Sequence, residues 1–139
     1  MKWTAPPGKR RGGADWLGLI FKDHGFLRFY WHNQHLVADG LWRSNQPGPT
    51  RIATLAKTGI KTIVNLRGPR QDGSWQLEAE ACAKAGITLL DFTARSRAAP
   101  SKEMLYDARD LFAALETPTL IHCKSGADRA GLISALYLL

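Results

Sequence analysis

The chain has 139 residues, of which 45% are hydrophobic, and this length predicts one domain with a single sizeable core. Its formal net charge of +7 at pH 7 favours anionic partners: phosphorylated proteins, phosphoinositides, inositol phosphates, nucleic acid or a membrane surface. Two cysteines, Cys82 and Cys123, exclude a disulfide framework. No secretory signal and no apolar span of about 20 residues appears, so a reducing cytoplasm is the expected location.

Three parts are expected along the chain. Residues 1–13 combine prolines and glycines with basic side chains, which predicts a disordered basic arm, either a weak tether to an anionic surface or a solvated tail. Residues 14–34 predict a short helix and an aromatic segment packed on the domain. Basic residues do not interleave regularly with these aromatics, which argues against nucleic-acid binding. Residues 35–139 are expected to form the main domain.

The main domain begins with a predicted hairpin. Residues 35–38 and 41–44 have strand character, and the Asp39-Gly40 pair between them favours a two-residue turn. A helix is predicted from Pro49 to about Thr58, followed by an apolar strand over residues 60–66.

Helices and strands continue to alternate after this point. Ser74 is the predicted N-cap of a helix over residues 75–85, and a strand follows over residues 87–90. Ser101 is the predicted N-cap of a helix that reaches about Leu115. The side chains expected on the buried side of this last helix are Leu105, Leu111, Phe112 and Leu115.

This alternation predicts an α/β fold with a mostly parallel sheet flanked by helices. In such folds the site lies at the carboxyl ends of the strands. Arg67, Asp91 and Cys123 each stand at or just after such an end, so they are expected to converge on one edge of the sheet.

The stretch from Thr119 to Leu139 predicts an anion-binding cradle. A short apolar run before Cys123 indicates a buried strand, Gly126 supplies a turn, and the residues from Gly131 onward are apolar at helical spacing. A loop that closes onto a helix N-terminus directs unpaired backbone N–H groups at one point, where an oxyanion or a thiolate is stabilised. Arg129 enters the first helical turn with a fork of donors suited to phosphoryl oxygens.

The segment from His122 to Arg129 resembles the His-Cys-x5-Arg signature of the cysteine-dependent protein tyrosine and dual-specificity phosphatases. The segment Arg43-Ser-Asn-Gln-Pro47 resembles an Arg-Ser-x-Gln-Pro element in a bacterial and fungal branch of these enzymes, where it indicates the start of the domain rather than its chemistry. Residues 65–67 resemble the same branch, and the resemblance covers about residues 35–139. The alternative is a buried strand-end cysteine at Cys123 and a solvated helix residue at Arg129.

Thiolate-based hydrolysis of a phosphate ester assigns a role to each cradle residue. Cys123 is the expected nucleophile and forms a phosphocysteine, while Arg129 and the loop N–H groups bind the phosphoryl oxygens. His122 is expected to fix the loop and help keep the thiolate ionised. The expected phosphate-binding loop comprises Lys124, Ser125, Gly126, Ala127, Asp128 and Arg129.

The general acid has two candidates. The resemblance implies an aspartate about thirty residues before the cysteine, and Asp91 precedes Cys123 by 32 positions (123 minus 91). Asp128 is the rival, because some lipid-directed relatives have an aspartate directly before the arginine.

One residue departs from the family pattern. Relatives have Ser or Thr directly after the arginine, where the hydroxyl helps the thiolate leave, whereas this chain has Ala130. The hypothesis is that the phosphocysteine is hydrolysed slowly. A phosphate-binding pseudophosphatase with little turnover is therefore carried as an alternative to the enzyme.

The substrate class rests on the basic residues near the cradle. Lys124, Arg67, Arg95 and Arg97 supply more cations than one phosphotyrosine needs, a pattern that suits an inositol phosphate or phosphoinositide as the alternative to a phosphoprotein. The equal alternative is that these arginines satisfy acceptors within the loops. No cofactor or metal is expected, since the histidines lack metal-ligand spacing. The last residues of the chain are apolar, which indicates either that the domain lacks further C-terminal helices or that another surface covers these residues.

Overall fold

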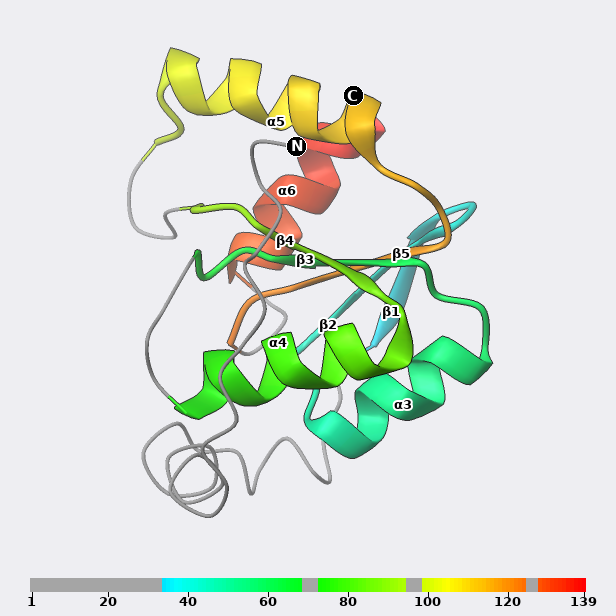
Figure 1. Ribbon diagram of the computed structural model, residues 1–139. Coiled ribbons are helices and arrows are strands. Elements are labelled where there is room, and N and C mark those ends of the chain that lie inside the picture. Colours follow the sequence, from blue (N-terminus) through cyan, green and yellow to red (C-terminus); the bar gives the residue numbers. More distant parts are fainter. Residues whose placement is uncertain (1–33, 69–72, 95–98, 125–127) are drawn as a thin grey trace.

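The computed structural model describes residues 34–68, 73–94, 99–124 and 128–139. The predictions for residues 1–33, Arg95, Arg97 and residues 125–127 lie outside these ranges. The described elements, in chain order, are β1 (His35–Ala38), β2 (Leu41–Ser44), α3 (Pro49–Lys57), β3 (Thr62–Asn65), α4 (Gly73–Ala85), β4 (Thr88–Asp91), α5 (Lys102–Ala114), β5 (Thr119–His122) and α6 (Asp128–Leu138) (Figure 1).

The strands form one sheet in the order β1-β2-β5-β3-β4. β1 and β2 pair antiparallel as a hairpin, whereas β2 with β5, β5 with β3 and β3 with β4 pair parallel. The predicted mostly parallel sheet is confirmed, and β1 makes it mixed. Asn65 stands in register with both His122 and Asp91, so the carboxyl ends of β5, β3 and β4 are neighbours.

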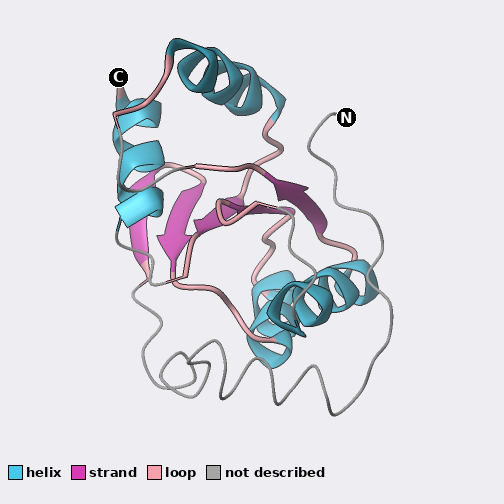
Figure 2. Cartoon of the chain, turned by 90° about the vertical axis from the view of Figure 1, so that its left-hand side faces the viewer, coloured by secondary structure: helices cyan, strands magenta, loops and turns pink. Residues whose placement is uncertain are grey.

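Helices cover both faces of this sheet. α3 and α4 lie on one face, and α5 and α6 lie on the other (Figure 1 and Figure 2). Because successive strand side chains point to opposite faces, Ile63 and Leu120 join the core under α3 and α4, whereas Val64 and Ile121 join the core under α5 and α6. The central strands β3 and β5 are therefore buried on both faces, as their apolar sequences predict.

Capping residues set several helix boundaries. The Ser101 hydroxyl accepts a hydrogen bond from Met104 N at 3.1 Å and caps α5, as predicted. α3 begins at Pro49, and Gly59, after its end, has a φ of +99° that glycine adopts without strain.

Two details of the predicted helices are wrong. α4 begins at Gly73, so Ser74 lies buried inside the first turn and is not the N-cap. Leu105 is 38% exposed, because Ala108 and Leu111, which are one helical turn apart, occupy the inward side of α5. Phe112 and Leu115 are partly buried against the same core, as expected.

The end of α6 is packed on one side only. Tyr137 meets Phe112 of α5 edge-on, with ring centroids 5.2 Å apart, whereas Leu138 and Leu139 are exposed. Within the described ranges no helix combines the length and apolar character needed to cross a bilayer.

Candidate active site

The backbone around Cys123 has the predicted order of strand, loop and helix. β5 ends at His122, Cys123 follows, and α6 begins at Asp128, so Arg129 lies in the first helical turn. Residues 125–127 between them lie outside the described ranges, and of Asp128 only the backbone is described. Gln46 N donates a hydrogen bond to Lys124 O at 3.3 Å and ties the loop to the segment after β2.

Cys123 lies on the α6 side of the sheet. Its side chain is 1% exposed and belongs to the core cluster that includes Ile121, Ala130 and Ile133. Arg129 is half-buried on the same helix. The helix N-terminus, the arginine and the thiol are thus positioned by β5 and α6, as the sequence predicts.

His122 lies on the opposite side, toward α4. Its Nδ1 is 3.2 Å from the Cys123 carbonyl oxygen, and its Nε2 is 2.6 Å from Glu78 Oε1. Both side chains are fully buried. The histidine therefore connects the backbone of the nucleophile to a carboxylate on α4.

Gln46 extends this connection. Its Nε2 donates to Glu78 Oε2 at 2.9 Å, and its Oε1 accepts from Arg67 Nη1. The Arg-Ser-x-Gln-Pro element was expected only to indicate the start of the domain, but its glutamine lies inside the site. Sequence reasoning also missed Glu78, although its place between Trp75 and Cys82 on the inward side of α4 signals a buried carboxylate.

Arg67 does not project freely into the cradle. It is 8% exposed, and its Nη1 is bound to Gln46, as in the expectation that the arginines satisfy acceptors in the loops. Asn65 Oδ1 accepts from Arg67 N at 3.0 Å, and Asn65 Nδ2 donates to Gly68 O at 2.9 Å. These hydrogen bonds position the segment after β3 beside the site.

The segment after β4 is attached to this one. Phe92 N donates to Asn65 O at 2.9 Å, and Ala94 N donates to Leu66 O at 3.1 Å. The chain that leads from Asp91 to residues 95–98 therefore starts next to Arg67.

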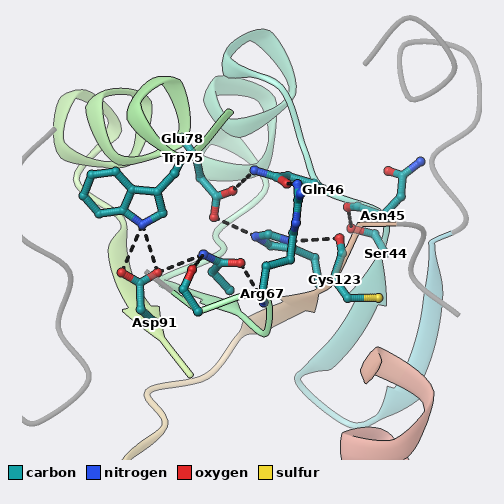
Figure 3. Close-up of polar contacts among 11 residues, drawn as sticks. Ser44, Asn45, Gln46, Arg67, Trp75, Glu78, Asp91 and Cys123 are labelled. Carbon is teal, nitrogen blue, oxygen red and sulfur yellow. Dashed lines mark hydrogen bonds and ion pairs between the residues drawn. The ribbon is translucent and has the colours of Figure 1, made fainter. Parts of the chain in front are cut away.

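Asp91 lies at the predicted edge, at the end of β4. Its carboxylate accepts from Trp75 Nε1 at 3.1 and 3.2 Å and from Asn65 Nδ2 at 2.9 Å (Figure 3). Burial raises the pKa of Asp91, while these two donors oppose the shift. Trp75 belongs to α4, so the carboxylate is turned toward α4, whereas Cys123 packs toward α6.

Two further side chains have structural surroundings. Cys82 is 1% exposed, and burial raises the pKa of its thiol, so this residue has a packing role in the core. Ala130 is fully buried, and its carbonyl oxygen accepts a hydrogen bond from Ser134 Oγ at 2.6 Å. Across the described residues, no group of three or more His, Cys, Asp or Glu side chains could hold a metal ion.

A cysteine between a buried parallel strand and a helix that starts with Asp-Arg defines the class of cysteine-dependent phosphatases. Residues 32–138 match the family model described as DSP-PTPase phosphatase fused to NAD+ Kinase. The chain therefore belongs to this family of dual-specificity phosphatases.

Known relatives support this placement. The chain is 30% identical over 106 residues to the dual specificity protein phosphatase TpbA of Pseudomonas aeruginosa strain PAO1, a match that covers 76% of this chain and 45% of TpbA. The chain thus spans less than half the length of this curated relative. The TpbA of strain UCBPP-PA14 matches at 29% identity over the same coverage.

Solved structures have the same fold. The crystal structure of TpbA superposes with a TM-score of 0.59 at 30% identity, covering 76% of this chain and 62% of that one. The core catalytic domain of the PP-IP phosphatase SIW14 from S. cerevisiae has a TM-score of 0.63 at 24% identity, covering 75% of this chain and 63% of that one. A putative phosphatase from Neisseria meningitidis has a TM-score of 0.57 at 26% identity, covering 70% of each chain.

Proposed function

We propose that this chain hydrolyses phosphomonoesters through a phosphocysteine on Cys123, as a protein tyrosine or dual-specificity phosphatase. The observation that carries the proposal is the placement of Cys123 between β5 and the first turn of α6, with Arg129 in that turn. The family relationship supports it, and TpbA has been solved as a cysteine-to-serine variant with phosphotyrosine. We take residues 35–139 as the catalytic domain and residues 1–13 and 14–34 as additions to it.

The chemistry proceeds in two steps. The Cys123 thiolate attacks phosphorus, the bond from phosphorus to the ester oxygen breaks, and that oxygen takes a proton from a general acid. Water then attacks the phosphocysteine and gives a proton to the carboxylate left by the general acid, the bond from phosphorus to sulfur breaks, the thiolate leaves, and inorganic phosphate is released. Arg129 and the backbone N–H groups of residues 124–129 bind the phosphoryl oxygens in both steps.

The general acid is Asp91 in this proposal. Its raised pKa and its position at the end of β4 support the role, although its carboxylate must leave Trp75 to reach a substrate on Cys123. Asp128 is the rival, and the side chain of Asp128 lies outside what the structure describes.

Hydrolysis of p-nitrophenyl phosphate tests the proposal. We expect turnover by the wild-type chain, its loss in Cys123→Ser, and a fall of about 10²- to 10³-fold in Arg129→Lys, which removes the planar fork. Glu103→Gln on the exposed face of α5 is the control and should retain full activity. Activity that survives Cys123→Ser would overturn the thiolate mechanism.

An inositol phosphate or phosphoinositide is the second candidate substrate class. It is favoured by Lys124, which lies half-buried beside Cys123, and by the net charge of +7. Phosphopeptides, phosphoinositides and inositol phosphates should therefore be compared as substrates of wild type and Cys123→Ser. If the chain binds these compounds but releases no phosphate, the pseudophosphatase alternative holds instead.

The proposed location is a reducing cytoplasm. A thiolate nucleophile is active only in its reduced form, and both Cys82 and Cys123 are free thiols.

A further inference from the structure

A series of hydrogen bonds connects Arg67 to the Cys123 backbone. The chemistry of each group determines which atom donates and which accepts in these bonds. A guanidinium only donates hydrogen bonds, so Arg67 fixes the Gln46 side-chain oxygen toward itself and the Gln46 amide nitrogen toward Glu78. Glu78 Oε2 accepts from this amide at 2.9 Å, and Glu78 Oε1 remains for His122.

The same logic assigns the protons of His122. A carbonyl oxygen only accepts, so Nδ1, 3.2 Å from Cys123 O, carries a proton. One oxygen of Glu78 accepts from the Gln46 amide, and the other lies 2.6 Å from His122 Nε2. A carboxylate oxygen at this distance is suited to accept a hydrogen bond from a second ring proton on Nε2. These contacts fit an imidazolium at His122, directly before the nucleophile, balanced by the charge of Glu78.

We propose that Glu78, oriented by Gln46, is a positioning residue that keeps His122 doubly protonated and directed at the Cys123 carbonyl, and thereby stabilises the Cys123 thiolate. The inference rests on the nucleophilic role of Cys123 in the proposed function. Its physical reason is burial. Both ionic side chains are 0% exposed, and a buried imidazolium without a counter-ion loses its proton rather than remain charged.

Other titratable groups lie near this pair but do not replace Glu78. Asp91 interacts electrostatically with both Glu78 and His122, and its hydrogen bonds go to Trp75 and Asn65. Cys82 also feels the charge of Glu78, and burial raises the pKa of its thiol and keeps it neutral. Arg67 is linked to the pair through Gln46, which bonds to both Arg67 and Glu78. Among the described residues, Glu78 is the carboxylate that contacts the His122 ring.

The protonation state is tested by 15N NMR of the histidine rings in the whole chain, with the His122 signals assigned by their loss in His122→Gln. At pH 7 we expect both ring nitrogens of wild-type His122 to carry protons. In Glu78→Gln we expect one to be lost. A singly protonated His122 in the wild type would overturn the inference without any variant having to fold.

The effect on the nucleophile is tested by the pH dependence of Cys123 alkylation with iodoacetamide, localised by mass spectrometry. Glu78 and His122 act with opposite signs, so the direction of the shift decides between mechanisms. If His122 loses its charge with Glu78, the alkylation midpoint rises by about one pH unit, which slows the reaction about tenfold at pH values below the wild-type midpoint. An unchanged midpoint, or one that falls because His122 keeps its charge, would overturn the inference.

Two further variants complete the design. Glu103→Gln makes the same substitution at an exposed position and should leave the alkylation midpoint unchanged. Gln46→Leu removes the amide that orients Glu78 and should shift the midpoint in the same direction as Glu78→Gln, by less. Alkylation and NMR need no turnover, so a chain that hydrolyses nothing but shows these shifts contradicts the proposed function and not the role of Glu78.

Discussion

At Asp91, burial and hydrogen bonding favour opposite protonation states. Burial raises the pKa of the carboxyl, which favours the protonated form that a general acid needs, whereas donors on Trp75 and Asn65 favour the ionised form. A general acid works only while protonated, so a raised pKa extends activity to higher pH, and activity is lost as the pH rises through that value.

Replacement of Asp91 by Asn should therefore depend on the leaving group. Turnover of an alkyl phosphate, whose oxygen must be protonated, should fall by about 10²-fold or more, while that of p-nitrophenyl phosphate falls less. The alkaline limb of kcat/KM should disappear with it. Trp75→Phe removes one donor to the ionised carboxylate and should move that limb to higher pH.

If Asp91→Asn lowers turnover equally with both substrates and leaves the alkaline limb unchanged, Asp91 is not the general acid. Its role is then structural, as the acceptor of hydrogen bonds from Trp75 and Asn65. The same measurements on Asp128→Asn would then test the rival acid.

Ala130 gives a second prediction at the residue scale. It is fully buried beside Cys123, and the nearby Ser134 hydroxyl is bound to the Ala130 carbonyl oxygen, so Ser134 is not available to assist the leaving thiolate. We expect a burst of product followed by slow turnover in the wild type. Ala130→Ser should raise the steady-state rate by about tenfold, equivalent to about 1.4 kcal/mol of barrier.

Rapid-quench measurement of enzyme-bound phosphate distinguishes the two steps. Ala135→Ser, at an exposed position on the same helix, is the matched control and should change neither phase. The hypothesis of a slow second step is wrong if no phosphoenzyme accumulates in the wild type, or if Ala130→Ser leaves the steady-state rate unchanged.

At the scale of elements, the close packing of the segment after β3 against the segment after β4 requires a glycine at position 68. Gly68 has a φ of +76°, and an added methyl group would overlap Thr93 Oγ1 on the neighbouring segment. Gly68→Ala should lower the free energy of unfolding by about 1–3 kcal/mol and also reduce kcat/KM, because Arg67 and the segment after Asp91 would be displaced.

Gly59→Ala is the matched control. Gly59 has a φ of +99° with open space around its Cα, so its replacement costs stability by backbone strain alone and should leave kcat/KM intact. Chemical unfolding and steady-state kinetics on both variants test the contrast, and equal kinetic effects would contradict it. Thr93→Ala in the Gly68→Ala background should recover part of the loss.

The secondary structure was accessible from the sequence because its boundaries are chemical. Pro49, Gly59, Ser101 and the Asp39-Gly40 turn each impose a local conformation, and the apolar runs of β3 and β5 predict strands buried on both faces. The right-handed crossover rule for parallel strands limits the possible strand orders but does not select one. The register that brings Asn65 beside both His122 and Asp91 is known only from the structure.

The candidate site was accessible only where its residues are contiguous. The segment from His122 to Arg129 shows its chemistry by spacing, whereas Gln46 and Glu78 are separated by 32 positions and Glu78 and His122 by 44. A hydrogen bond across such a separation leaves no periodic signal. Gln46 could be noticed only as part of a motif, and Glu78 only as a charge on an inward helix face.

For the whole molecule, the net charge of +7 is expected to act on binding more than on chemistry. Charges separated by more than about 8–10 Å are screened at physiological salt, so distant cations steer a substrate at low ionic strength and lose influence as salt is added. Only cations next to Cys123, such as Lys124, continue to contribute. The salt dependence of kcat/KM, compared between substrates of different charge, therefore indicates the substrate class.

Raising the salt concentration should lower kcat/KM several-fold more for an inositol polyphosphate than for a singly phosphorylated peptide if the polyanion is the substrate. Lys124→Gln should lower kcat/KM for the polyanion at both low and high salt, because it removes a cation beside the nucleophile, whereas Lys102→Gln on exposed α5 should not. Alkylation of Cys123 by neutral iodoacetamide is the internal control and should respond little to salt. Equal salt dependence for the two substrates, together with no loss of polyanion turnover in Lys124→Gln, would favour a phosphoprotein, since a single phosphoryl group is bound mainly by Arg129 and the loop N–H groups.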